Sequence, residues 1–226
     1  MLPREGLPPV FSNKKLVRGL VTKIRKAERL SLEALQRGRV EHEPAFTDRL
    51  LGSMEHVLNG ARIGGVSWTA KTLTDRGANS QESEFGADFM AVFQASLPDF
   101  AIAKGFLAQS KLLEPGQSFA PAEAHRLKAQ CENMLNHSPA SYVFVYSQQS
   151  GILVVPAADV VAARDCNPHD LTSMPMGKFY EHHFECFIGD RAIKSATPDG
   201  LRVLRTQLEA RRLFLLSGKS DPGRSG

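Results

Sequence analysis

Two apolar, β-prone segments follow each other in this chain, at residues 88–96 and 101–113. They are joined by Pro98 and Asp99, and this pair is typical of a turn. The sequence therefore predicts a β-hairpin of two long antiparallel strands.

Polar residues lie at the end of this hairpin that is distant from the turn. Asp88 opens the first strand, and antiparallel pairing places it level with Gln109 and Lys111 near the end of the second. Gln109 and Lys111 are two residues apart and therefore project from the same face of their strand. Alternatively, Asp88 caps a turn, Gln109 bonds to a loop and Lys111 extends to solvent.

Asp88, Gln109 and Lys111, in this order on two strands, resemble the PD-(D/E)xK, or restriction-endonuclease-like, nuclease superfamily. The resemblance is to the variant in which Gln replaces the second acidic residue, and it covers roughly residues 41–157. It implies that Asp88 binds a divalent cation, that Gln109 lies beside it, and that Lys111 faces the attacking water and the scissile phosphate.

Many members add a Glu on the helix before the first core strand, with apolar residues three and seven positions later. Glu43 has this relation to Phe46 and Leu50, so it is the matching position. Because Gln109 carries no negative charge, Mg²⁺ or Mn²⁺ would be held by Asp88, the carbonyl of Ser110, Glu43 and water. Mg²⁺ accepts such a set of ligands because it prefers oxygen and keeps several waters.

The pattern of elements predicts an α/β fold with a mixed central sheet flanked by helices. In chain order these are helix, strand, hairpin, helix, strand and strand, at 44–59, 63–74, 88–113, 121–137, 141–146 and 152–156. The order α-β-β-β-α-β is that of the restriction-endonuclease-like core, here with a basic N-terminal helix. Gln130, on the helix at 121–137, matches a Gln that contacts the active centre in this superfamily, although an exposed helix amide is an equal alternative.

Positive charge is concentrated in residues 1–40, which contain ten Lys or Arg and three Glu. Apolar residues recur every three or four positions between 13 and 36, which predicts an amphipathic helix. The helix is interpreted as an arm that binds nucleic-acid phosphates through Lys14, Lys15, Arg18, Lys23, Arg25 and Lys26. A solvated face or a surface for a partner protein would have the same pattern.

Hydropathy and the order of the predicted elements indicate where the protein is located and where its domains begin and end. No apolar run reaches membrane-spanning length and no apolar leader opens the sequence, so a cytoplasmic protein with no membrane partner is expected. We expect an arm at 1–40, a nuclease domain at 41–216 and a flexible tail at 217–226. Within the domain, a strand is predicted at 184–188 and a helix at 198–216.

Cysteine and histidine near the end of the chain offer a second metal hypothesis. The candidate zinc ligands are Cys166, His169, His182 and Cys186. The spacing of the first pair is C-x-x-H rather than C-x-x-C, and Cys186 lies between two phenylalanines as a core cysteine would. The three cysteines are widely spaced, which argues against a disulfide framework.

The sequence thus favours a Mg²⁺-dependent DNA endonuclease, and the resemblance implies a setting in bacterial (antiviral) defence or DNA processing. The first alternative is a module of the same fold that binds nucleic acid without cleaving it. The second is a nuclease subunit that docks on a partner protein of such a complex through its basic helix. A homo-oligomer is also compatible with the sequence.

Overall fold

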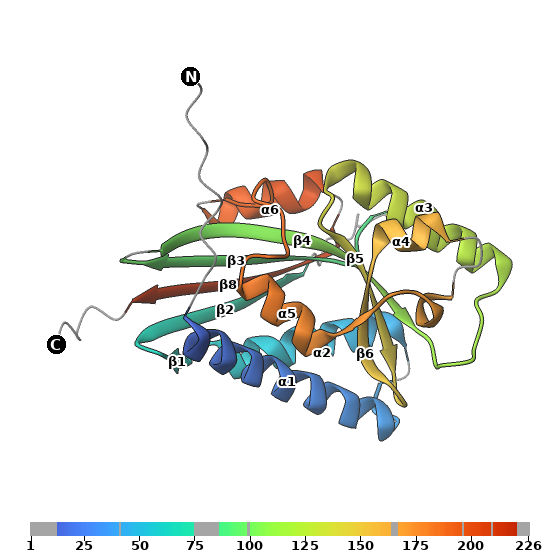
Figure 1. The fold of residues 1–226 in the computed structure, drawn as a ribbon, viewed down its shortest axis with the longest axis horizontal. Coiled ribbons are helices and arrows are strands. Elements are labelled where there is room, and N and C mark those ends of the chain that lie inside the picture. The colour runs from blue at the N-terminus through green and yellow to red at the C-terminus, as the bar shows by residue number, and fades with distance from the viewer. Residues whose placement is uncertain are drawn as a thin grey trace.

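A mixed eight-stranded sheet forms the centre of the described chain (Figure 1). The computed structural model describes residues 13–40, 42–74, 86–98, 100–163, 167–195, 197–208 and 210–220. The strands are β1 Arg62–Ile63, β2 Val66–Thr74, β3 Phe89–Leu97, β4 Phe100–Leu112, β5 Ser141–Ser147, β6 Gly151–Pro156, β7 Met174–Pro175 and β8 Arg212–Ser220. Their order across the sheet is β1-β2-β8-β3-β4-β5-β6-β7. Pairs β3–β8 and β4–β5 are parallel and the others are antiparallel.

Helices cover both faces of this sheet, which confirms the α/β class and the flanked mixed sheet. They are α1 Lys14–Gln36, α2 Glu43–Leu58, α3 Pro121–His137, α4 Ala157–Ala162, α5 Met176–Phe184 and α6 Pro198–Gln207, with a 3₁₀ turn at Pro168–Asp170. Helices α1, α2 and α5 bury their apolar sides against one face, and α3, α4 and α6 lie on the other (Figure 1). The sheet is therefore the middle layer between two apolar cores.

Helix α1 is part of the first core. Asn13 caps it by accepting a hydrogen bond from the backbone N–H of Leu16 at 3.1 Å. Leu16, Leu20 and Ile24 are completely buried and pack with α2 and the sheet. The predicted helix is thus confirmed, but it is integrated into the fold rather than held apart as an arm, because its apolar side packs against α2 and the sheet.

The element order from α2 to β5 agrees with the sequence pattern, with one difference at the first strand. The segment predicted as a single strand over 63–74 is a hairpin of β1 and β2. Gly64 and Gly65 form its turn with φ values of 62° and 78°, in the left-handed region that favours glycine.

The prediction for the last part of the chain is wrong in three places. Residues 176–184 form α5, so the strand expected at 184–188 is absent from the described structure. The helix expected over 198–216 ends at Gln207, and β8 begins at Arg212. Residues 217–219, expected in a loose tail, pair with both β2 and β3, and Ser220 pairs with β2. Residues 221–226 lie outside the described residues. A short apolar run such as 213–216 fits a buried strand as well as a helix.

No helix within the described ranges is long and apolar enough to cross a membrane.

Lys104 is an unusual component of the first core, because only 2% of its surface is exposed. Its ammonium donates hydrogen bonds to the carbonyl oxygens of His183, in the last turn of α5, and of Ile188, which follows that helix. Burial lowers the pKa of Lys104 from 10.5 to about 8, because the charged form is poorly solvated there.

Lys104 should therefore make stability depend on pH. Between about pH 8 and pH 10.5 the unfolded chain binds this proton more tightly than the folded one, so folding stability rises with pH. The expected gain is on the order of 1 kcal/mol per pH unit, measured by urea unfolding of the native protein relative to Lys104→Met at pH 7.5 and pH 9.5. Lys219→Met, which removes an exposed lysine, is the control. Equal pH dependence of native and Lys104→Met protein would contradict the lowered pKa.

Candidate active site

The candidate site forms where β4 extends beyond β3. Phe89, the first residue of β3, pairs with Ala108, whereas β4 continues to Leu112. On its other side this extension is paired with β5, from Gln109 opposite Val143 onward. The backbone of β4 is therefore open on one side over residues 109–112, where β3 does not reach.

Two carboxylates satisfy backbone N–H groups along this open edge. Asp88 Oδ2 accepts a hydrogen bond from the N–H of Ser110 at 2.8 Å, and Glu43 Oε2 accepts one from the N–H of Leu112 at 3.0 Å. Glu43 is the first residue of α2, as expected from the sequence. Asp88, which precedes β3, and Glu43, which begins α2, are thus both bound to the open edge of β4.

The expected neighbours of Asp88 are in place. The side-chain amide of Gln109 donates to Asp88 Oδ2 at 2.7 Å, as the hairpin register requires. Lys111 Nζ lies 3.5 Å from Glu43 Oε1, and the lysine side chain is only 9% exposed. The structure therefore brings Glu43, Asp88, Gln109 and Lys111 into one cluster.

Burial sets the charge state of the two acids. It raises the pKa of Asp88, although the N–H of Ser110 and the charge of Lys111 act in the opposite direction. Burial also raises the pKa of Glu43, with Lys111 lowering it and the negative charge of Asp88 raising it further. A cation placed between these carboxylates would favour their ionised forms and so be bound in return.

The oxygen atoms at the site fit Mg²⁺ or Mn²⁺. Gln109 is 2% exposed, and its Oε1 atom has no hydrogen-bond partner among the described residues. The carbonyl of Ser110 points to the same side of β4 as its N–H, hence toward Asp88. With Asp88 Oδ1 and Glu43 Oε1 this makes a set of oxygen donors, which hard divalent cations prefer.

The site has few charged ligands. In the described part of the chain no three His, Cys, Asp or Glu residues are grouped so that they could hold a metal ion. A cation here would depend on two carboxylates, carbonyl oxygens and water. This composition suits Mg²⁺, which keeps several waters, better than zinc, which takes N and S ligands.

Three buried hydroxyl groups connect the elements that carry the site. Thr47 Oγ1, Ser110 Oγ and the Tyr146 hydroxyl lie 2.9 to 3.2 Å from one another. Thr47 Oγ1 also donates to the carbonyl of Glu43 at 3.1 Å. This hydroxyl triangle joins the first turn of α2 to β4 and β5 and so fixes Glu43 relative to Lys111. Sequence reasoning missed it, because only the packing of three separate elements brings these residues together.

The surroundings of Asp88 are completed by Arg211 and by Arg212, the first residue of β8. Sequence reasoning missed both. Arg212 binds the Asp48 carboxylate through two nitrogens, one at 3.1 Å, and also approaches the carbonyl oxygens of Pro44 and Asp88. A guanidinium nitrogen of Arg211 lies 4.0 Å from Asp88 Oδ1. The prediction of a helix over 198–216 gave neither residue a place near the site.

The basic residues at the start of α1 lie at a distance from this cluster. Lys14, Lys15, Arg18, Arg25 and Lys26 are exposed and Lys23 is partly buried. Helices α1 and α2 run in opposite directions (Figure 1), and Leu16 adjoins Gly64 at the β1–β2 turn. Glu43 begins α2, and the 16 residues of this helix separate it from the end near the β1–β2 turn by about 24 Å at 1.5 Å per residue. Contacts of the six basic residues with DNA stay a prediction, and those of Lys14, Lys15 and Arg18 would lie outside the cluster.

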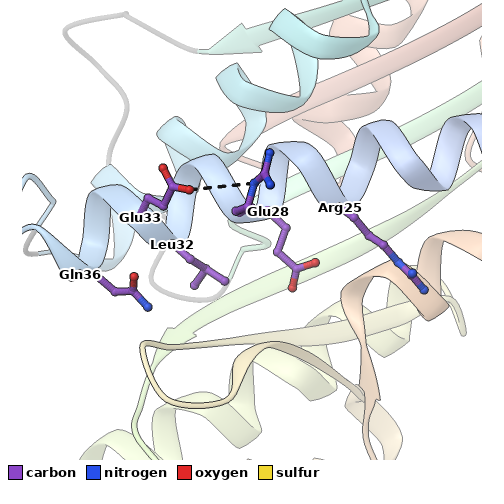
Figure 2. Close-up of a pocket in the computed structure, with 6 residues that line it drawn as sticks. Arg25, Glu28, Leu32, Glu33 and Gln36 are labelled. Atoms are coloured by element: carbon purple, nitrogen blue, oxygen red, sulfur yellow. Dashed lines mark ion pairs between the residues drawn. The ribbon is translucent and has the colours of Figure 1, made fainter.

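Farther along α1, the exposed side borders a hollow of about 250 Å³ (Figure 2). Arg25 and Glu28 project to the same side, and Arg29 lies 4.0 Å from Glu33. The arginines are therefore balanced by glutamates here, which weakens the case for a continuous phosphate-binding stripe.

Gln130 is on the buried side of α3, 7% exposed. Helix α3 packs on the sheet through Leu127, Cys131 and Met134. Gln130 is thus not the exposed amide of the alternative interpretation, and its contact with nucleic acid stays a prediction.

Zinc binding by Cys166, His169, His182 and Cys186 stays a prediction. Cys166 lies outside the described residues, as do Glu82 and Glu84, two acids that precede Asp88 in the sequence. His169 Nε2 bonds to the carbonyl of Leu113 at 2.8 Å, and His182 Nδ1 lies 3.6 Å from Glu185.

Comparisons with protein-family models, with curated proteins and with solved structures found no match for this chain. The function of the site is therefore inferred from its residues.

Proposed function

We propose that this protein is a metal-dependent nuclease that hydrolyses phosphodiester bonds in DNA. The observation that carries the proposal is the convergence of Asp88, Gln109 and Lys111 with Glu43 at the open edge of β4. Two acids with raised pKa values beside an ammonium group are costly to assemble, which favours a functional role over a structural one.

In this proposal Asp88, Glu43 and the carbonyl of Ser110 hold Mg²⁺ or Mn²⁺, and Gln109 orients Asp88 through its amide N–H. A divalent cation there would lower the pKa of a bound water and offset negative charge on the phosphate. Lys111 supplies a second positive centre for the charge that develops in the transition state. Glu43 keeps the Lys111 ammonium in position through the ion pair at 3.5 Å.

The element order also supports a restriction-endonuclease-like core as part of the proposal. α2, β2, β3, β4, α3 and β5 follow the expected order. Strand β8 lies between β2 and β3, so in this sheet the first core strand does not pair with the hairpin.

The proposal is tested by incubating the purified protein with plasmid, linear duplex, single-stranded DNA and RNA. We expect cleavage of DNA with Mg²⁺ or Mn²⁺ and none with EDTA, because the carboxylates alone cannot activate water. A plasmid cut equally well in EDTA would contradict the metal dependence. Intact substrates under all metal conditions would contradict the nuclease itself.

A second candidate is a module that binds nucleic acid without cleaving it. Each carboxylate already accepts a backbone N–H of β4, so each has a structural role that does not require a metal. Such a module would bind DNA in the same assay and leave it intact. A docking subunit would cleave only after its partner protein is added, and the exposed polar side of α1 is the part of that helix still available for docking.

A further inference from the structure

A cavity of about 470 Å³ lies on the sheet at the end opposite to the candidate site. Its floor is formed by β3, β4 and β8, and the strand ends that it occupies point to the left in Figure 1. Gln94 of β3 is one of the floor residues. Asp88 precedes the same strand, about 20 Å from Gln94 at 3.3 Å per residue. A ligand in the cavity would therefore not touch the carboxylates of the site.

Short side chains leave this space open above the sheet. One row nearer the site, Val92 pairs with Gly105, and Ile193 packs closely over that glycine. The next row of the same face, two residues farther along each strand, contains Ala103 and Ser217. These side chains are too short to fill the volume that Ile193 fills in the row before.

The wall of the cavity is fixed to its floor by hydrogen bonds. Lys194 and Ser195, in the segment before α6, form part of the wall. The side-chain amide of Gln94 donates to the carbonyl of Ser195 at 2.7 Å. In turn, the Ser217 hydroxyl donates to Gln94 Oε1 at 3.2 Å. The cavity is therefore formed before any ligand binds, and its volume is in the range of small-molecule sites.

The lining of the cavity is positively charged. Lys194 in the wall and Lys219 in the floor both border it, and both residues are exposed. Neither ammonium group has a hydrogen-bond or ion-pair partner in the described part of the chain. Among the described residues that line the cavity, none is acidic. The cavity is thus complementary to an anion.

The other lining groups narrow the kind of anion. Polar side chains such as Gln94, Ser96 and Ser217 alternate with short apolar ones such as Ala103. An acyl chain would displace water from these polar groups without replacing its hydrogen bonds. A nucleobase has apolar faces and hydrogen-bonding edges, so it suits such a mixed floor. A phosphate monoester carries nearly two negative charges at pH 7, which two lysines can match.

We propose that this cavity binds a free nucleotide, with its phosphate at Lys194 and Lys219 and its base on the floor at Ala103. The inference goes beyond the proposed nuclease function and does not depend on it. The two sites lie at opposite ends of the same strands and use different residues.

The test titrates the purified protein by calorimetry with AMP, GMP, CMP and UMP, each separately. EDTA is present, so that no cation can link a phosphate to Asp88 and Glu43. At least one nucleotide should bind, and its nucleoside and inorganic phosphate should each bind more weakly, because each supplies only part of the contacts.

A double variant, Lys194→Gln with Lys219→Gln, should weaken binding of this nucleotide about tenfold, since each exposed charge contact contributes up to about fivefold. Replacing both lysines by Arg should preserve binding, because the charges remain. Ala103→Leu should abolish nucleotide binding without a change of charge, because the longer side chain occupies the floor. Thermal unfolding shows that each variant is folded.

The matched control replaces Lys71 and Lys178 by Gln, which removes the same charge from two exposed lysines outside the cavity. It should leave nucleotide affinity unchanged. Native affinity in the folded Lys194→Gln, Lys219→Gln protein would place the nucleotide elsewhere and overturn the inference.

Two other results would also overturn it. One is that none of the four nucleotides binds. The other is that octanoate or a 5′-phosphorylated DNA strand binds through the two lysines while free nucleotides do not, which would assign the cavity to an acyl chain or a strand end. DNA cleavage is measured separately, so failure of either proposal leaves the other standing.

Discussion

An Asp88→Asn variant is expected to fold and to lose metal-dependent cleavage by on the order of 10³-fold or more, because stabilisation by a bound cation supplies several kcal/mol. Asp88 contacts both Gln109 and the Ser110 N–H and also presents an oxygen to the site. Asparagine keeps the size and one acceptor oxygen but cannot neutralise a divalent cation.

The comparison with Asp88→Ala separates charge from structure. Alanine also leaves the Ser110 N–H and the Gln109 amide without their acceptor, at a cost of about 1–3 kcal/mol for a buried group. Thermal unfolding should therefore show a lower Tm for Asp88→Ala than for Asp88→Asn, with cleavage at background in both. Cleavage at the native rate by Asp88→Asn would show that the acid is not a metal ligand.

The second large effect is expected at Lys111. Lys111→Met should lower kcat by about 10²-fold or more, as loss of a charge-stabilising donor in the transition state does. DNA affinity should change little, because the Lys111 side chain is 9% exposed and paired with Glu43. Single-turnover cleavage and anisotropy on the same preparations give the two quantities.

The matched control for this variant is Lys178→Met, which removes an exposed lysine of α5. It should leave turnover unchanged. Normal turnover in Lys111→Met would remove this ammonium from the mechanism. A Lys111→Met protein that loses affinity as much as rate would instead assign Lys111 to substrate binding.

The contrast between these residues and Arg211 explains what the sequence could reveal. The juxtaposition of Asp88 and Gln109 follows from a hairpin, where a turn fixes the register between neighbouring segments. Arg211 reaches the same place through a parallel pairing between residues more than 120 positions apart. No local pattern encodes such a pairing, so the residues near 212 could not be placed.

The same reasoning applies to the helices. Asn13 and the apolar spacing after it define where α1 begins and which side it buries, so its existence could be predicted. The integration of α1 into the core could not be predicted, because the spacing of apolar residues does not show which surface will cover them. The Thr47–Ser110–Tyr146 contacts likewise depend on how α2 approaches β4 and β5.

The position of β8 between β2 and β3 has a consequence for how the chain reaches its native state. Val66 pairs with Ser220 and Phe89 with Arg212. Strands β2 and β3 therefore cannot complete their pairing until β8, which is synthesised much later, is available. Until then β2 and β3 have unpaired edges, which are templates for pairing with other chains. Contacts of such high sequence separation slow folding, because a long loop must close before they form. The acids of the site can therefore gather early on the hairpin and α2, while the arginines arrive only when the sheet is completed.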